Sequence, residues 1–81
     1  MDVESKVKLI TFNGEINSIE ECDPTENYWI LVGKTGTIIQ PENIRQRVLV
    51  KFDENVSELG LHCHNPIPNS LLILNSDLDL V

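Results

Sequence analysis

Short runs in which apolar and polar residues alternate dominate the chain, and most of them end at a glycine, proline, asparagine or aspartate. In the clearest run, Arg47–Phe52, the side chains of Val48, Val50 and Phe52 fall on one face and the intervening residues on the other. This period of two is typical of a half-buried β-strand. The same pattern, or a composition of β-branched and aromatic residues, predicts the other strands. These are Lys6–Phe12, Tyr28–Val32, Thr37–Ile39, Ser70–Leu74 and Asp79–Val81.

Residues that favour turns separate the predicted strands. The pair Asn13–Gly14 favours a tight hairpin, whose return strand would be Glu15–Ile19. The pair Asp23–Pro24 opposes both a helix and a central strand, so we predict a loop over the acidic stretch Glu20–Asn27. Two further connections are predicted, a long one over Val56–Asn69 and a single turn over Asn75–Leu78.

Helical periodicity is nearly absent, because no apolar stretch with a period of 3.6 reaches the ~10 residues of an ordinary helix. A chain of 81 residues has room for one domain, which we take to be residues 1–81. A few short strands protect their edges most simply by curling into a barrel. We therefore predict an all-β fold, a small five-stranded barrel with a long acidic first loop and at most one turn of helix.

Three segments resemble those of Src-homology-3-like barrels, which place a long loop between the first two strands. They are Gly33-Lys34-Thr35-Gly36-Thr37-Ile38, Arg47-Val48-Leu49-Val50-Lys51-Phe52-Asp53 and Asn75-Ser76-Asp77-Leu78. The first two are similar to the variable subunit of ferredoxin-thioredoxin reductase and, more distantly, to KOW-type barrels. The likeness to the reductase subunit implies a scaffolding role with a protein partner. The likeness to KOW modules implies RNA binding through basic loops.

The charge of the chain opposes nucleic-acid binding. Thirteen Asp and Glu against six Lys and Arg give a formal net charge of -7, which repels nucleic acids and anionic lipid headgroups. The charges are unevenly distributed, because the stretch between Lys8 and Lys34 contains no basic residue but five acids, Glu15, Glu20, Glu21, Asp23 and Glu26. A basic protein partner is the expectation that follows, because complementary charge accelerates and selects encounters.

The acidic loop and the aromatic pair after it form the predicted protein-binding site, made of Glu20, Glu21, Asp23, Glu26, Tyr28 and Trp29. An exposed aromatic side chain would anchor such a contact. Two plainer interpretations remain open. The acids would then form only a solvated loop, and Trp29 would fill the barrel interior while Tyr28 covers its mouth.

The sequence His62-Cys63-His64 holds the only candidate for metal or nucleophile chemistry. Adjacent residues of an extended segment point to opposite faces, so His62 and His64 could share a site while Cys63 could not. A further ligand, such as Cys22 or an acidic residue, would have to come from elsewhere. We expect no cofactor and no catalytic site. Cys22 and Cys63 could also form a disulfide, but without an export signal reduced thiols are expected.

The leading hypothesis is a non-enzymatic, acidic protein-binding module, which could neutralise a basic partner such as a toxin in the manner of an immunity protein. The alternatives are an accessory subunit of a redox or metal enzyme and a barrel associated with translation or transcription. The start of the chain lacks the pattern of a signal peptide. No apolar run approaches the roughly 18 to 20 residues that span a bilayer. These features predict a cytoplasmic protein without membrane or nucleic-acid partners, as a monomer or weak homodimer.

Overall fold

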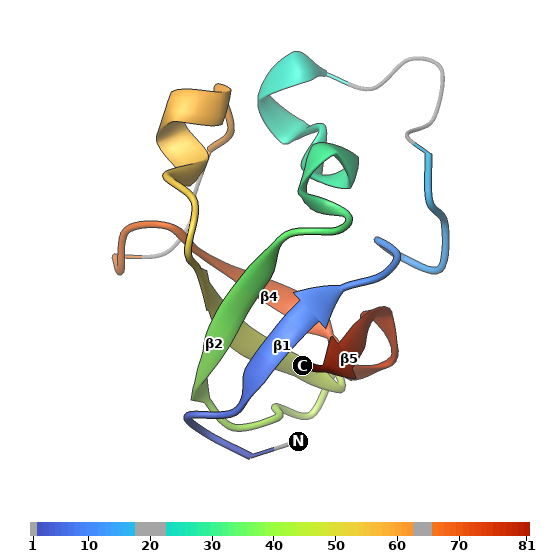
Figure 1. The fold of residues 1–81 in the computed structure, drawn as a ribbon, viewed down its shortest axis with the longest axis vertical. Coiled ribbons are helices and arrows are strands. Elements are labelled where there is room, and N and C mark those ends of the chain that lie inside the picture. Colours follow the sequence, from blue (N-terminus) through green and yellow to red (C-terminus); the bar gives the residue numbers. More distant parts are fainter. Residues whose placement is uncertain (1, 18–22, 63–65) are drawn as a thin grey trace.

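A computed structural model describes residues 2–17, 23–62 and 66–81. The described chain forms a single antiparallel sheet of five strands in the order β4-β3-β2-β1-β5 (Figure 1). The strands are β1 Lys6–Leu9, β2 Thr35–Gln40, β3 Arg47–Phe52, β4 Ser70–Leu74 and β5 Leu78–Leu80. The all-β prediction is confirmed, and β3 and β4 have the predicted bounds.

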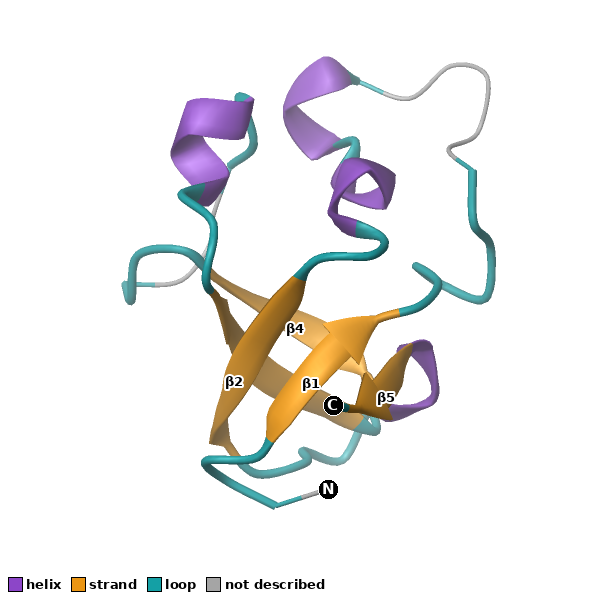
Figure 2. Cartoon of the chain, in the orientation of Figure 1, coloured by secondary structure: helices purple, strands orange, loops and turns teal. Residues whose placement is uncertain are grey.

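The helical content of the described residues is limited to four short 3-10 segments (Figure 2). They are η1 Pro24–Glu26, η2 Tyr28–Leu31, η3 Val56–Leu59 and η4 Asn75–Asp77. The predicted turn before the last strand is η4. The other three lie together at one end of the sheet, at the top of Figures 1 and 2. The two long connections of the chain, β1 to β2 and β3 to β4, therefore meet at that end.

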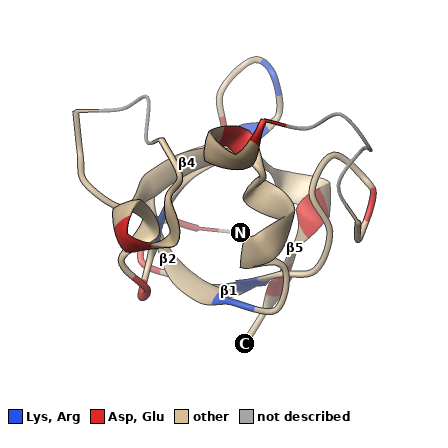
Figure 3. Cartoon of the chain, turned by 90° about the horizontal axis from the view of Figure 1, so that it is seen from above, with Lys and Arg blue, Asp and Glu red and all other residues tan. Residues whose placement is uncertain are grey.

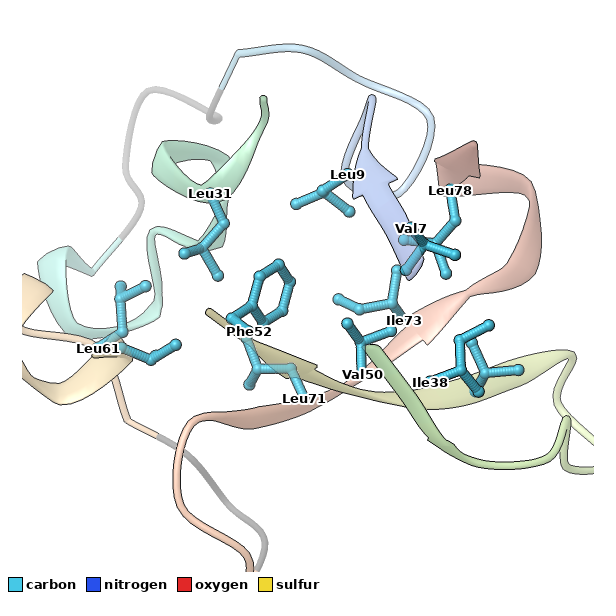
Figure 4. Close-up of a cluster of buried hydrophobic side chains, with 12 residues drawn as sticks. Val7, Leu9, Leu31, Ile38, Val50, Phe52, Leu61, Leu71, Ile73 and Leu78 are labelled. Atoms are coloured by element: carbon cyan, nitrogen blue, oxygen red, sulfur yellow. The ribbon is translucent and has the colours of Figure 1, made fainter. Parts of the chain in front are cut away.

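Strand β1 is an internal strand of the sheet, because it pairs with β2 on one side and with the edge strand β5 on the other. Viewed from above, the sheet curls around its own interior (Figure 3). Alternate side chains of the strands fill this interior, where Val7, Ile38, Val50 and Ile73 are completely buried (Figure 4). Leu31 of η2 covers the interior from the end that carries the 3-10 segments.

The hairpin predicted at Asn13–Gly14 forms only its turn. Both residues have positive φ angles, 52° and 82°, as the favoured two-residue turns require. A single bridge joins Phe12 to Glu15, without a return strand in the described residues up to 17. β1 accordingly ends at Leu9 rather than Phe12.

A buried carboxylate holds this turn in place. Asp77, only 1% exposed, accepts hydrogen bonds from Thr11 Oγ1 at 2.6 Å, Asn13 N at 2.9 Å and Gly14 N at 3.0 Å. The Asp77 carbonyl also accepts the N–H of Ile10 at 2.9 Å. Asp77 thus ties the start of the long first loop to the turn before β5.

The strand predicted over Tyr28–Val32 is wrong, because Tyr28–Leu31 is the 3-10 segment η2. Strand composition alone does not make a strand when no neighbouring strand offers hydrogen bonds. Here the segment follows Asn27 and turns inward, so that Leu31 enters the core while Ile30 stays 43% exposed.

Candidate protein-binding surface

The part of the acidic loop that the structure describes begins with a capped turn. Asp23 accepts hydrogen bonds from the backbone N–H of Thr25 at 2.9 Å and from its hydroxyl at 2.7 Å. Pro24 follows at the first position of η1, where its missing N–H costs nothing. The hydrogen bonds from Thr25 lower the pKa of Asp23, and the nearby His62 adds to this effect. Asp23 therefore presents a negative charge at a fixed position.

The segment that follows η3 is bound directly to the acidic loop. The N–H of His62 donates to the carbonyl of Thr25 at 3.0 Å. The hydroxyl of Tyr28 donates to the carbonyl of His62 at 2.7 Å. The two loops that the sequence marked separately, the acidic one and the histidine-containing one, are thereby joined into one surface. His62 enters this surface through both of its main-chain polar groups.

The ring of Phe12 packs against the two aromatic side chains of η2. The Phe12 and Trp29 rings meet edge to face, with centroids 4.9 Å apart and planes at 81°. The Phe12 and Tyr28 rings are tilted by 50° at 5.5 Å. Trp29 and Tyr28 are both half-buried, so Trp29 does not fill the interior as one interpretation of the sequence held. Leu31 has that position, and Ile30 is the exposed apolar side chain of the segment.

Acidic residues, coloured red on the ribbon in Figure 3, occur on the 3-10 segments at the same end of the molecule. Asp23 and Glu26 lie on or beside η1, and Glu58 lies on η3. Neither residues 23–33 nor residues 53–62 contain a lysine or arginine. Asp53 and Glu54, which also follow β3, form ion pairs with lysines, whereas Glu58 lies further along on an exposed turn. The end that carries the 3-10 segments therefore has a negative local field.

Several residues of the predicted sites lie outside the described residues: Glu20, Glu21, Cys22, Cys63 and His64. His62 is exposed. Within residues 2–17, 23–62 and 66–81, no group of three or more His, Cys, Asp or Glu side chains is placed to hold a metal ion. With three or four residues each, the described helical segments are far too short to cross a membrane.

Sequence reasoning missed the residues that connect the surface. Thr25 carried no special weight in the sequence, yet its three polar groups bind Asp23 and His62. The signal for the first contact was present, because an aspartate before Pro-Thr is a familiar cap pattern. The contact with His62 has no local signal, since main-chain groups pair regardless of side chain.

The molecule is thus a small all-β protein whose five antiparallel strands carry a capped, acidic end. No protein-family model, no curated protein and no solved structure matches this chain.

Proposed function

We propose that the protein is a non-enzymatic binding module that receives the basic surface of another protein on the end formed by η1, η2 and η3. The observation that carries the proposal is the double contact of His62, whose N–H binds Thr25 and whose carbonyl binds Tyr28. Through this contact, acids from two distant segments share one ordered surface. A preorganised surface loses less conformational entropy on binding than two separate loops would.

Charge and apolar area occur together on this surface, as a docking site requires. Asp23, Glu26 and Glu58 supply a negative field that would steer a basic partner and select against acidic ones. Ile30, 43% exposed, supplies apolar area beside the half-buried rings of Tyr28 and Trp29. Apolar side chains at the centre of an interface contribute most of its binding energy, and charged residues at its rim set the rate of encounter.

The arrangement of the strands supports the further proposal that the sheet is a Src-homology-3-like barrel. The long connection lies between β1 and β2, β1 pairs with β5, and one 3-10 turn leads into β5. In such a barrel the loops between strands carry the specificity and the strands hold them in place. A partner with a basic active site, such as a toxin neutralised by an immunity protein, fits a surface of this charge.

Charge reversal at the acidic end tests the proposed function. The double variant Glu26→Lys/Glu58→Lys changes two exposed acids of η1 and η3. The matched control Asp2→Lys/Glu42→Lys makes the same change in net charge in exposed segments at the opposite end of the sheet. Each protein is immobilised and exposed to an extract of the native cell at physiological salt, and the retained proteins are identified by mass spectrometry.

We expect the wild type and the control to retain the same basic protein and the Glu26→Lys/Glu58→Lys variant to lose it. Retention should also fall as salt is raised, because the steering field is screened over about 10 Å at 0.1 M ionic strength. Equal retention by both variants would show that the acidic end is not the binding surface.

A further inference from the structure

Strand β4 has one edge without a neighbouring strand among the described residues. The bonds from Phe52 N to Asn69 O and from Asn75 N to Gln46 O mark hydrogen-bonded pairs at either end of the β3–β4 ladder. Hydrogen-bonded and non-hydrogen-bonded pairs alternate along an antiparallel ladder. The main-chain N–H and C=O groups of successive β4 residues therefore point alternately toward β3 and away from it. Leu72, in the centre of β4, therefore directs its N–H and C=O to the open side of the sheet.

The outer face of β3 and β4 beside this edge is apolar at its centre and basic at its ends. Leu49 lies directly opposite Leu72, and neither belongs to the core inside the barrel. Leu49 is nevertheless only 3% exposed, whereas Leu72 is 41% exposed. Arg47 and Lys51 flank Leu49 on the same face, because they are two positions away along the strand.

No acidic residue occurs in β3 or β4. Among the described ion pairs, Lys6 and Lys34 have carboxylate partners, but Arg47 and Lys51 have none. Arg47 reaches neutral oxygens instead, the carbonyl of Leu72 and the side-chain oxygen of Asn13, both at 3.3 Å. In a protein with a net charge of -7, this face holds two cations without an acid beside them in β3 or β4.

We propose that the free edge of β4 accepts an extended, acidic segment of a partner protein as an additional antiparallel strand. Leu72 would exchange both main-chain hydrogen bonds with the partner residue opposite it, as in other cases of strand addition. The side chain of that partner residue would be apolar and cover Leu72. The partner residues two positions before and after it would lie beside Leu74 and Ser70, which are the β4 residues opposite Arg47 and Lys51. Acids at these two positions would face the two cationic side chains across β4.

The guanidinium of Arg47 already lies at this edge, on the carbonyl of Leu72. On binding, a main-chain N–H of the partner would replace the guanidinium as the donor to the Leu72 carbonyl. Arg47 would then be released to bind a partner carboxylate in a stronger, charge-assisted hydrogen bond. Before binding, Arg47 covers an edge that would otherwise be exposed to unspecific pairing. The same side chain thus protects the edge and selects for an acid.

A second copy of this chain fits the edge less well than an acidic segment. Antiparallel pairing of two β4 strands would place Arg47 and Lys51 of both copies on one continuous face of the joined sheet. No acid from β3 or β4 would balance these cations, whereas an acidic segment brings its own carboxylates to this face. Each copy also carries a net charge of -7, which adds long-range repulsion.

The test uses two synthetic peptides that differ only in charge, TETITET and TKTITKT, each titrated into the isotope-labelled full-length protein and followed by NMR. We expect the acidic peptide to shift the amide signals of Leu72 and its neighbours in β4 and to slow hydrogen exchange at Leu72. Lys51→Glu should weaken the acidic peptide about tenfold, the scale of one charge-assisted hydrogen bond, and improve binding of the basic one. Arg45→Glu, with the same change of charge in an exposed turn, should leave both titrations unchanged.

A second variant tests the main-chain part of the proposal. Leu72→Pro removes an N–H that points to the open side, a position at which an edge strand tolerates proline. If the Leu72→Pro variant keeps the native spectrum but no longer binds the acidic peptide, the result supports strand addition. If this variant unfolds, the Lys51→Glu and Arg45→Glu comparison still decides. Equal binding of both peptides, no binding, or shifts confined to the 3-10 end would overturn the proposal. So would a dimer of the wild type that dissociates on Leu72→Pro substitution.

Discussion

The hydroxyl of Tyr28 donates a hydrogen bond of 2.7 Å to the main-chain carbonyl of His62, a residue 34 positions further along the chain. This bond and the one from His62 N to Thr25 O span the two long connections of the sheet. No described β-strand joins these two connections to each other. The relative position of the two loops therefore depends on these polar contacts together with the packing of Leu31, Val56 and Leu61 in the shared core.

Tyr28→Phe removes the hydroxyl and keeps the ring against Phe12. We expect a loss of about 1 kcal/mol in the free energy of unfolding, the usual net contribution of one hydrogen bond. We also expect faster hydrogen exchange at the His62 amide, because His62 loses one of its main-chain hydrogen bonds to the acidic loop. Urea denaturation and NMR exchange measure the two effects.

His62→Ala is the matched control for that variant, since it removes the imidazole and leaves the carbonyl that Tyr28 binds. Its free energy of unfolding should stay within about 0.5 kcal/mol of the wild type, as for other surface substitutions. A larger loss in His62→Ala than in Tyr28→Phe would mean that the side chain rather than the main chain joins the loops.

Asp77 offers a second prediction, because its buried carboxylate accepts three hydrogen bonds from the turn around Asn13 and Gly14. Asp77→Asn keeps the size but loses the charge and one acceptor oxygen. We expect a loss of about 2–3 kcal/mol, in the range for hydrogen bonds to charged groups. Asp79→Asn, at an exposed position of β5, should cost little. Thermal and urea unfolding of the two variants compare them directly.

The sequence was sufficient to predict most of the strands, because each strand has one face in the core and the alternation of side chains records it. Arg47–Phe52 and Ser70–Leu74 were predicted with their observed bounds. The alternation was incomplete at Leu49, which was predicted to lie on the outer face. It does lie on that face, between Gln40 of β2 and Leu72 of β4, but it is also buried, which the alternation does not predict.

The contacts between distant segments could not be predicted from the sequence. The composition of Tyr28–Leu31 favours a strand, but a strand needs a partner, and the described sheet has none for it. The role of Asp77 depends on the turn at Asn13 reaching it across the molecule. A single sequence does not encode such pairings in any local pattern. The predicted acids Asp23 and Glu26 were found on one ordered turn, whereas Glu20 and Glu21 lie outside the described residues.

Gly36 gives a prediction about packing within the sheet. A Cβ at this position would lie 2.7 Å from the carbonyl oxygen of Lys51 and 2.8 Å from a methyl group of Val50. The first contact is with backbone, which cannot rotate away, so Gly36→Ala must push β2 from β3. We expect a loss of about 1–3 kcal/mol, as for other overpacked sites, measured by urea denaturation.

Gly33→Ala separates this effect from a general intolerance of glycine replacement. Gly33 has a φ of +92°, but a Cβ at this position would meet no atom within 4 Å beyond its chain neighbours. Its replacement therefore costs only backbone strain of about 1–2 kcal/mol. Changes in the amide signals of β3 should accompany Gly36→Ala alone. Their absence in that variant would contradict the close approach of the two strands.

The ion pair between Lys6 and Asp53 predicts a dependence of stability on pH. The hydrogen bond from Lys6, followed by one from Thr35 at 2.7 Å, lowers the pKa of Asp53 in the folded protein. A carboxyl whose pKa is lowered by folding stabilises the protein at pH values above its unfolded pKa, about 3.9 for aspartate. This contribution is lost as the pH falls through the lower, folded pKa.

The variants Asp53→Asn and Lys6→Met separate this contribution from those of other acids. Both side chains of the pair are nearly half exposed, at 45% and 46%, so the effect on stability is small and weakens with salt. We expect the wild type to lose more stability than Asp53→Asn between pH 5 and pH 2, with Lys6→Met between them because Thr35 still binds the carboxylate. Urea denaturation at a series of pH values measures this. Parallel pH profiles for the wild type and Asp53→Asn would show that Asp53 titrates alike in the folded and unfolded chains.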